Sequence, residues 1–122
     1  MEEKVRFTFS KEERLRKERE FREVFDHGKS LGGSTVAFYF KPNQLGFPRA
    51  GFIVSKKVSK KAVERNRAKR LMREVFRLNK HKLKPYDLIF IARKGILGKK
   101  FQEVERDFLS LAKRAGILKE QE

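Results

Sequence analysis

The most concentrated chemistry in this sequence is cationic. Thirteen lysines and arginines but only two acids lie between Lys56 and Lys84, so this stretch carries +11 of the +16 net charge of the 122 residues. Charge of one sign at this density suits a polyanion, because each phosphate that a cation neutralises also releases a condensed counterion. Nucleic acid is therefore the first class of partner to consider, and an anionic membrane surface is the second.

We expect a helix from about Ala62 to Lys80, with two sides of different character. On a helical wheel, one sector is apolar and the opposite one is cationic. A charged sector is ordinarily a solvated face, but such faces usually mix both signs because like charges at i,i+4 repel. The like-charged pairs Lys69 with Arg73 and Arg73 with Arg77 instead favour a cationic ridge that binds a polyphosphate. The apolar sector holds Ala68, Leu71, Met72, Val75, Phe76 and Leu78, and the opposite one Asn66, Lys69, Arg70, Arg73, Arg77 and Lys80.

The residues just before this helix extend the cationic stretch. Ser55 to Lys61 contains two serines and four lysines, at a point where a strand should end and the helix begin. Hydroxyls, ammonium groups and the first N–H groups of a helix all bind phosphate oxygens. We therefore expect a phosphate site here.

Groups that could cleave RNA without help are scattered along the chain. There is no cysteine, and His27 and His81 cannot form a zinc site alone. Asp26, Asp87 and Asp107 lack the paired-carboxylate spacing of a two-metal nuclease. We expect no catalytic residue in this protein.

The remaining elements predict an α+β domain in the order α-β-β-α-β-α. A first helix is expected over Ser10–Asp26. Two β-rich segments, Thr35–Phe40 and Arg49–Ser55, favour a hairpin with a long turn. After the cationic helix, a strand over Tyr86–Arg93 implies a parallel crossover, and an amphipathic helix is expected over Phe101–Ala115.

Length and composition favour one folded domain over residues 1–122. Hydrophobic residues make up 39% of the chain, with 12 phenylalanines, which is too much for a disordered basic tail. The longest apolar runs, such as Leu88–Ala92, are far too short to span a membrane, and the start of the chain has no apolar leader region. We expect a cytoplasmic protein. Whether residues 1–9 are ordered or flexible is left open.

Three segments of the chain resemble the bacterial ribonuclease P protein family. The first is Arg65-Asn66-Arg67 with the following Lys69-Arg70, preceded by Val54–Val58. The others are Phe21–Ser30, similar to the family's first helix and turn, and Asp87–Arg93, similar to its last strand. The Arg-Asn-Arg box alone is a weak match, but three segments in this order and spacing are a strong one. One departure is the link Ser59-Lys60-Lys61, where members often have a shorter, glycine-containing link.

The resemblance implies an α-β-β-α-β-α fold with a small mixed sheet. Its β-α-β crossover would be left-handed, against a rule that holds in about 98% of cases. It also implies a subunit of an endoribonuclease that removes 5′ leaders from precursor tRNA, with catalysis by an RNA subunit that uses Mg²⁺ and with no organic cofactor. The partners would be ribonuclease P RNA and precursor tRNA, not a membrane, and weak self-association is left open. The residues that bind the RNA subunit would be Lys56, Lys57, Arg65, Asn66, Arg67, Lys69, Arg70 and Arg73.

A cleft between the first helix and the sheet is also implied by the resemblance. It would hold the single-stranded leader, with Phe21, Phe25 and Tyr39 as its lining. From the residues alone, two phenylalanines at i,i+4 on a helix are more often core than a platform for bases. Tyr39 has a stronger case, because strand alternation places it with Thr35 and Ala37 on the smaller and more polar face of its strand.

Three other functions are weighed against this one. A ribosomal or other structural RNA-binding protein fits the composition equally well. A self-sufficient metal-dependent nuclease is disfavoured by the scattered carboxylates. A regulator that binds duplex DNA would be expected to carry more Asn, Gln or Ser, and fewer like charges, on its recognition helix.

Overall fold

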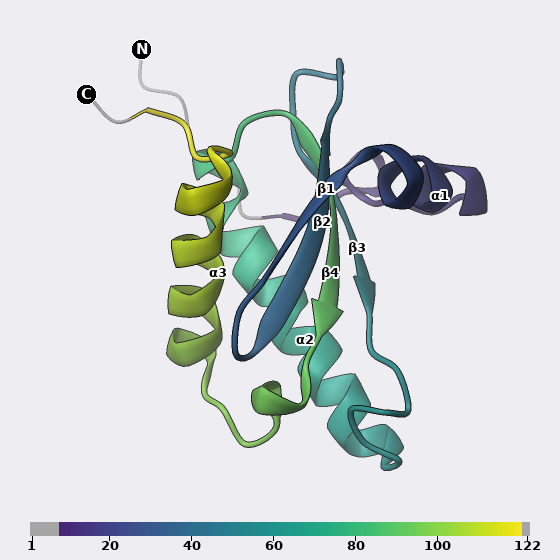
Figure 1. The fold of residues 1–122 in the computed structure, drawn as a ribbon, viewed down its shortest axis with the longest axis vertical. Helices are drawn as coiled ribbons and strands as arrows, with labels where there is room; N and C mark the ends of the chain where they lie inside the picture. Colours follow the sequence, from purple (N-terminus) through teal and green to yellow (C-terminus); the bar gives the residue numbers. More distant parts are fainter. Residues whose placement is uncertain (1–7, 121–122) are drawn as a thin grey trace.

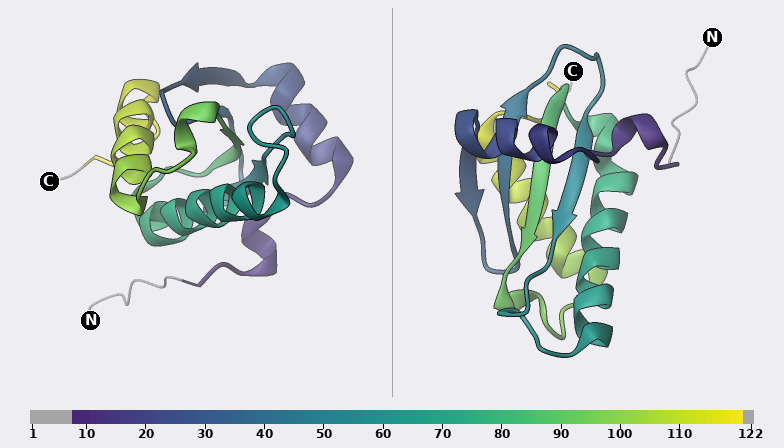
Figure 2. Two further views of the ribbon diagram at one scale, coloured as in Figure 1. Left: turned by 90° about the horizontal axis from the view of Figure 1, so that it is seen from below. Right: turned by 90° about the vertical axis from the view of Figure 1, so that its right-hand side faces the viewer.

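A computed structural model describes residues 8–120 and has an α+β fold in three layers (Figure 1 and Figure 2). A four-stranded sheet forms the middle layer; α1 crosses one face, and α2 and α3 cover the other. Across residues 8–120, no helix has both the length and the apolar character needed to cross a membrane. The elements are η1 (Lys11–Glu13), α1 (Glu18–His27), β1 (Lys29–Gly32), β2 (Val36–Pro42), β3 (Arg49–Ile53), α2 (Ala62–Asn79), η2 (Lys80–Lys82), β4 (Tyr86–Ala92), η3 (Lys94–Ile96) and α3 (Phe101–Ala115).

The sheet has the strand order β1-β2-β4-β3, with β4 antiparallel to β2 and parallel to β3. The predicted hairpin between β2 and β3 is therefore wrong, because β4 lies between them. The run Leu88–Phe90 is buried on both sides, which is the environment of a central strand and not of an edge. The parallel crossover from β3 through α2 to β4 is confirmed, and its hand stays a prediction.

The hairpin that does form joins β2 to β1, a strand that the sequence did not predict. The N–H of Gly33 donates to the carbonyl of Val36 at 2.8 Å, closing the turn. Asp107 on α3 fixes this turn, because its Oδ2 accepts from the N–H and the hydroxyl of Thr35 at 2.9 and 2.6 Å. A Cβ at Gly33 would lie 2.3 Å from the Asp107 carboxylate. Thr35 is thus buried in a structural contact, and its predicted place on an open face is wrong.

The predicted helix over Ser10–Asp26 is interrupted. Ser10 and Glu13 cap the short turn η1, with the Ser10 N–H and hydroxyl donating to the Glu13 carboxylate, each at 2.9 Å. The chain then dips to the edge of β3, where the Leu15 N–H donates to the carbonyl of Ala50 at 3.0 Å and the Leu15 side chain is buried. Only after this contact does α1 begin, so burial of Leu15 outweighs helix continuity.

Hydrophobic clusters of unequal size lie on the two faces of the sheet and hold the layers together. The larger lies between the sheet and the α2–α3 pair and includes the rings of Phe90 and Phe108, with centroids 4.9 Å apart and planes tilted by 31°. The smaller lies under α1, around Leu15, Val24 and Ile89. Because one helix covers less of the sheet than two, the sheet face on the α1 side has partly exposed apolar residues, Tyr39, Ile53 and Ile91, and Phe21 of α1 packs among them.

Candidate RNA interface

The ridge along α2 is real but shorter than predicted. Asn66, Lys69, Arg70 and Arg73 are exposed. Among residues 8–120, no carboxylate lies within ion-pair distance of Lys69, Arg70 or Arg73. These three neighbouring cations have no ion-pair partner, and Glu74 acts on Arg73 only through a longer-range electrostatic interaction. A bound anion would relieve their mutual repulsion.

Beyond Arg73 the ridge ends, contrary to the helical-wheel prediction. Arg77 pairs with Glu74, and this hydrogen bond lowers the pKa of the Glu74 carboxyl. Lys80 is only 8% exposed and contacts the Glu13 carboxylate at 2.6 Å. Burial alone would raise the pKa of Glu13, but hydrogen bonds from Lys80 and Ser10 outweigh it and lower that pKa. A wheel cannot anticipate that η1 packs against the end of α2 and supplies this partner.

The two arginines of the Arg-Asn-Arg box point to flanking loops. Arg65 donates through Nη1 to the carbonyl of Ser59 at 3.0 Å, and Arg67 donates through Nη2 to the carbonyl of Lys99 at 2.8 Å. Both side chains are half-buried, whereas Asn66 between them is exposed. A guanidinium has five N–H donors, so each arginine can hold its loop and still offer donors to RNA.

The link before α2 is ordered by its own serine. The Ser59 hydroxyl donates to the Glu64 carboxylate and accepts from the N–H of Lys61 at 3.1 Å. This hydroxyl is therefore engaged within the protein, which removes it from the predicted phosphate site. Lys56 and Lys57 are exposed in the preceding turn. Lys57 also lines an open polar pocket of about 440 Å³ at the ends of β3 and β4, together with Ser34, Ser55, Arg93 and Lys94.

The three aromatic residues of the predicted cleft lie where α1 meets the sheet. Phe25 and Tyr39 are in edge-to-face contact, with ring centroids 4.8 Å apart, and Phe25 is 37% exposed. Phe21 lies one helical turn earlier over β3, so close to Gly51 that a Cβ there would meet the Phe21 ring at 2.5 Å. Phe21 is thus partly core, while Phe25 and Tyr39 offer ring surface to a ligand.

An apolar strip continues from these rings along the sheet. Ala37 on β2 pairs with Ile91 on β4, which pairs in turn with Ile53 on β3, and all three are half-exposed. Figure 2 shows α1 crossing the strands near one end and leaving the rest of this face without a helix. The strip leads towards the cationic pocket that contains Lys57 and Arg93.

A pocket of about 280 Å³ connects this face to the ridge at the β3 edge. Its aromatic lining is Phe9, Phe21 and Phe52, and no acid of the described chain lines it. Phe21 belongs to the cleft, while Lys69 and Arg73 belong to the ridge. The cations that line it are Arg14, Arg16, Lys69 and Arg73. The cleft and the ridge are therefore neighbouring parts of one surface.

A partly buried ionic network holds α1 in place over the sheet. Arg49 on β3 donates to Glu20 on α1 and to Asp87 on β4, each at 2.7 Å, and Asn43 also donates to Asp87, at 2.8 Å. Burial by itself raises the pKa of Glu20, but the N–H groups of Lys17 and Arg16 and the Arg49 guanidinium outweigh it and lower this pKa to about 2. Hydrogen bonding to Asp87 raises the pKa of Arg49.

Sequence reasoning missed this network, although a signal was present. Arg49 and Asp87 are the charged members of two otherwise apolar β segments, and a charge buried in a sheet needs a partner. Of the aspartates considered for catalysis, Asp87 and Asp107 thus serve structural contacts, and Asp26 is exposed at the end of α1. Within residues 8–120, no three His, Cys, Asp or Glu side chains gather closely enough to hold a metal ion. His27 is the last residue of α1, and His81 lies in η2.

The chain is similar over most of its length to proteins of one family. Residues 9–116 match the family Ribonuclease P. The ribonuclease P protein component of Clostridium botulinum (strain Loch Maree / Type A3) is 43% identical over 109 residues, which cover 88% of this chain and 97% of that protein. The protein component of Pelotomaculum thermopropionicum is 45% identical over 104 residues, covering 84% and 92% of the two chains.

Solved structures agree with this assignment. The ribonuclease P protein of Thermotoga maritima superimposes with a TM-score of 0.75 at 37% identity and covers 84% of this chain and 96% of its own. The Staphylococcus aureus protein gives a TM-score of 0.78 at 28% identity, with 88% and 98% covered. The fold, the cationic ridge and these relatives together show that the chain belongs to the ribonuclease P protein family, the protein subunits of a ribonucleoprotein endonuclease that processes tRNA.

Proposed function

We propose that this chain, as one domain over residues 1–122, contacts two RNA molecules through the connected surface described above. The ridge on α2 binds the catalytic RNA, and the cleft between α1 and the sheet binds the single-stranded 5′ leader of precursor tRNA. The observation that carries the proposal is the pocket at the β3 edge, where ridge cations and a cleft aromatic residue line one cavity.

The ridge contacts the RNA subunit through phosphate groups. Its exposed cations without acidic partners gain the most from a polyanion, because binding removes their mutual repulsion and releases counterions. Arg65 and Arg67 act beside them, holding the loops at Ser59 and Lys99 while offering their remaining donors. The proposed contacts are Lys56, Lys57, Arg65, Asn66, Arg67, Lys69, Arg70 and Arg73.

The cleft binds the leader with little preference for sequence. Bases stack on the exposed surfaces of Phe25 and Tyr39 with Phe21 beside them, and such stacking contributes about 1–3 kcal/mol per base whatever the base. Ala37, Ile53 and Ile91 continue the apolar strip. Since mature tRNA has no leader, these contacts favour substrate over product.

The hydrolysis itself is assigned to the RNA subunit with Mg²⁺. The protein's donor groups fit this division, since the described carboxylates are dispersed or engaged in structural bonds. The protein's own contribution is to reduce the repulsion between two RNA chains and to hold the leader. We place this activity in the cytoplasm, where tRNA is processed, and include weak self-association of the protein in the proposal.

Precursor-tRNA cleavage by a bacterial ribonuclease P RNA at low Mg²⁺ tests both parts. The protein should enable accurate cleavage, and it should strengthen substrate binding only when a leader is present. Cleavage that is unchanged by the protein contradicts the assignment of the ridge to the RNA subunit. If the protein improves cleavage and binding equally for substrates with and without a leader, the assignment of the cleft to the leader is contradicted.

A matched pair of substrates separates the two surfaces further. One precursor has a leader of several nucleotides, and the other carries the same tRNA with a single-nucleotide leader. Substitution of ridge residues should weaken activity on both substrates equally. Substitution of Phe25 or Tyr39 should weaken binding of the long-leader substrate alone.

A further inference from the structure

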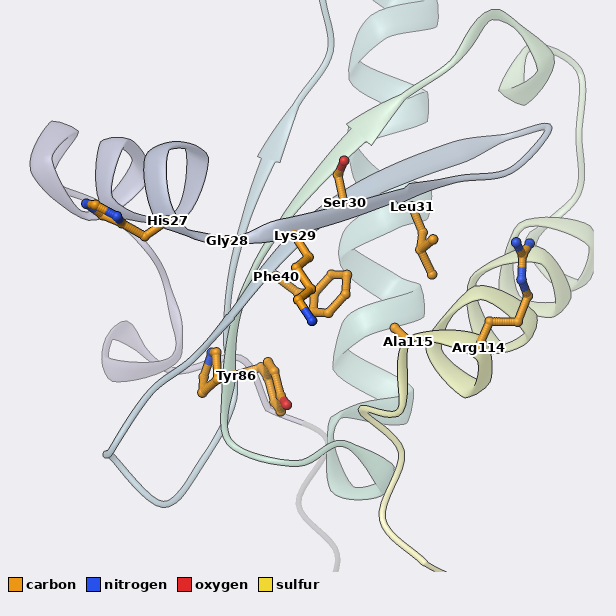
Figure 3. Close-up of a pocket in the computed structure, with 10 residues that line it drawn as sticks. His27, Gly28, Lys29, Ser30, Leu31, Phe40, Tyr86, Arg114 and Ala115 are labelled. Atoms are coloured by element: carbon orange, nitrogen blue, oxygen red, sulfur yellow. The ribbon is translucent and has the colours of Figure 1, made fainter.

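Another pocket lies on the α3 side of the sheet, away from the ridge and the cleft. It is a hollow of about 390 Å³ between the edge strand β1, the strand β2, the start of β4 and the last turn of α3 (Figure 3). Its size is within the range of pockets that hold small organic groups. The residues that line it are His27, Gly28, Lys29, Ser30, Leu31, Phe40, Pro42, Tyr86, Arg114 and Ala115.

The alternation of β1 separates this pocket from the cleft. Lys29 pairs with Phe40 and Leu31 with Phe38, which place them on the side of the sheet covered by α3. Ser30 between them pairs with Tyr39, the cleft residue. Although Ser30 also reaches the pocket lining, neither Phe25, Tyr39 nor any residue of α2 lines it.

The inner wall of the pocket is aromatic. The rings of Phe40 and Tyr86 lie with centroids 6.1 Å apart and planes tilted by 51°, and Leu31 and Ala115 complete the apolar surface. Tyr86 is half-buried, so part of its side chain remains accessible. Figure 3 shows the Tyr86 ring on the side of the hollow opposite Ala115 and Arg114 of α3. A flat apolar group fits against this wall.

The rim of the pocket is cationic and unneutralised. Lys29 and Arg114 are both exposed, and within residues 8–120 neither has a carboxylate at ion-pair distance. In the same part of the chain, no acidic residue lines the pocket. Aromatic surface next to unpaired cations is the combination that binds a nucleobase together with its phosphate.

We propose that this pocket binds one nucleotide of a single-stranded RNA segment, as a contact separate from the ridge and the cleft. The base lies against Tyr86, which packs on the buried ring of Phe40, and Lys29 and Arg114 bind the adjoining phosphates. This inference rests on the proposed function only in taking RNA as the ligand. An apolar peptide would gain nothing from the two cations, and inorganic phosphate would leave the aromatic wall unused.

The tyrosine content of the chain provides a direct test. The protein has two tyrosines, Tyr39 in the cleft and Tyr86 in this pocket. Labelling with 3-fluorotyrosine gives two ¹⁹F NMR signals, which Tyr39→Phe and Tyr86→Phe assign. The full-length protein is then titrated with a single-stranded pentanucleotide, with adenosine monophosphate and with inorganic phosphate.

The Tyr86 signal should shift saturably with the pentanucleotide, more weakly with adenosine monophosphate, and not with phosphate. In the Tyr39→Phe protein, Arg114→Ala should weaken the pentanucleotide affinity read at Tyr86 by about fivefold, the scale of one exposed charge contact. The matched control Lys113→Ala removes the same charge from the neighbouring exposed position of α3 and should leave that affinity nearly unchanged.

Several results would overturn the inference. The inference is contradicted if the Tyr86 signal does not shift with the pentanucleotide. It is also contradicted if Arg114→Ala and Lys113→Ala give the same pentanucleotide affinity. If the Tyr86 signal responds to adenosine monophosphate but not to the pentanucleotide, the ligand of the pocket is a free nucleotide and not an RNA strand, which contradicts the inference. The cleft is judged independently, because a Tyr39 signal that shifts while Tyr86 is silent supports the proposed function and contradicts only this inference.

Discussion

Arg49 donates to the carboxylate of Glu20 at 2.7 Å and thereby ties α1 to the sheet beneath it. The same guanidinium binds Asp87 through two further hydrogen bonds, at 2.9 and 2.7 Å. One cation thus connects α1, β3 and β4. We expect the distance between the helix and the sheet, and with it the room for the proposed leader, to depend on this contact.

Replacing Glu20 by Gln should make the protein less stable at pH 7 and change its response to acid. Because the pKa of Glu20 is about 2 in the fold and 4.5 as its ordinary value, its contribution is complete above about pH 5 and lost as the pH falls towards 2. After allowance for solvent screening, this contribution is about 2 kcal/mol. Urea unfolding of both proteins between pH 7 and 3 measures it.

The difference between the two proteins should therefore shrink as the pH falls. The control is Glu18→Gln, which removes a carboxylate from the exposed start of the same helix and whose ion pair with Arg22 is solvent-exposed. A stability difference for Glu20→Gln that stays constant from pH 7 to 3 would contradict the role given to the ion pair.

Arg73→Ala should weaken binding to the ribonuclease P RNA without destabilising the fold. Arg73 is exposed on the ridge and has no ion-pair partner among residues 8–120, so stability should change by less than about 0.5 kcal/mol. Removing one cation from a phosphate should lower the slope of log affinity against log salt by about 1. Filter binding at several salt concentrations measures the slope, with the exposed Arg106→Ala on α3 as the control. Equal slopes for the two variants would contradict the ridge.

Arg67→Lys should separate the structural role of the box from its charge. Lysine keeps the charge but cannot reproduce the planar guanidinium that donates to the Lys99 carbonyl at 2.8 Å. We expect a loss of about 1 kcal/mol in stability, with the salt slope of RNA binding unchanged. Thermal unfolding and filter binding on the same samples provide the two values. An unchanged melting temperature would show that the hydrogen bond to the loop contributes nothing.

Phe25→Ala should reduce affinity for precursor tRNA only when the leader is present. Phe25 is 37% exposed, so its removal should cost less stability than removal of a buried ring, while one stacking surface worth about 1–3 kcal/mol is lost. Leu45→Ala, at a residue that is 48% exposed outside the cleft, is the control for loss of exposed apolar surface. Equal weakening of leaderless tRNA binding would return Phe25 to a structural role. Phe21→Ala should cost more stability than Phe25→Ala, since its ring is packed on Gly51.

The helices with strong periodicity were predictable, and the arrangement of the strands was not. The bounds of α3 agree with the prediction, and those of α2 differ by one residue. β1 was missed because Lys29–Gly32 has only Leu31 as an apolar residue, so its pairing with β2 and not its composition makes it a strand. The order of strands depends on which segment is buried on both faces, and alternation within one segment does not report that.

In the candidate site, too, local features were predictable from the sequence and contacts between distant residues were not. Exposure of Lys69, Arg70 and Arg73 follows from local helical geometry, and a wheel predicts it. Lys80 forms an ion pair with Glu13, and Arg49 forms one with Glu20. Both acids are distant in sequence from their partners and are brought near by tertiary packing. Ion pairs between different helices and strands are long-range contacts, and no local sequence pattern predicts them.

The central position of β4 also has a consequence for how the chain folds during synthesis. Among the strands of residues 8–120, β4 alone joins the β1–β2 hairpin to β3. Until residues 86–92 leave the ribosome, the β1–β2 hairpin and β3 have no hydrogen-bonded partner in common, and a long loop must close before they are joined. When β4 pairs with β2 and with β3, it joins the β1–β2 hairpin to β3 in one sheet. A nascent chain that stops before residue 86 therefore already carries the whole basic stretch of α2 but lacks the sheet that would support it.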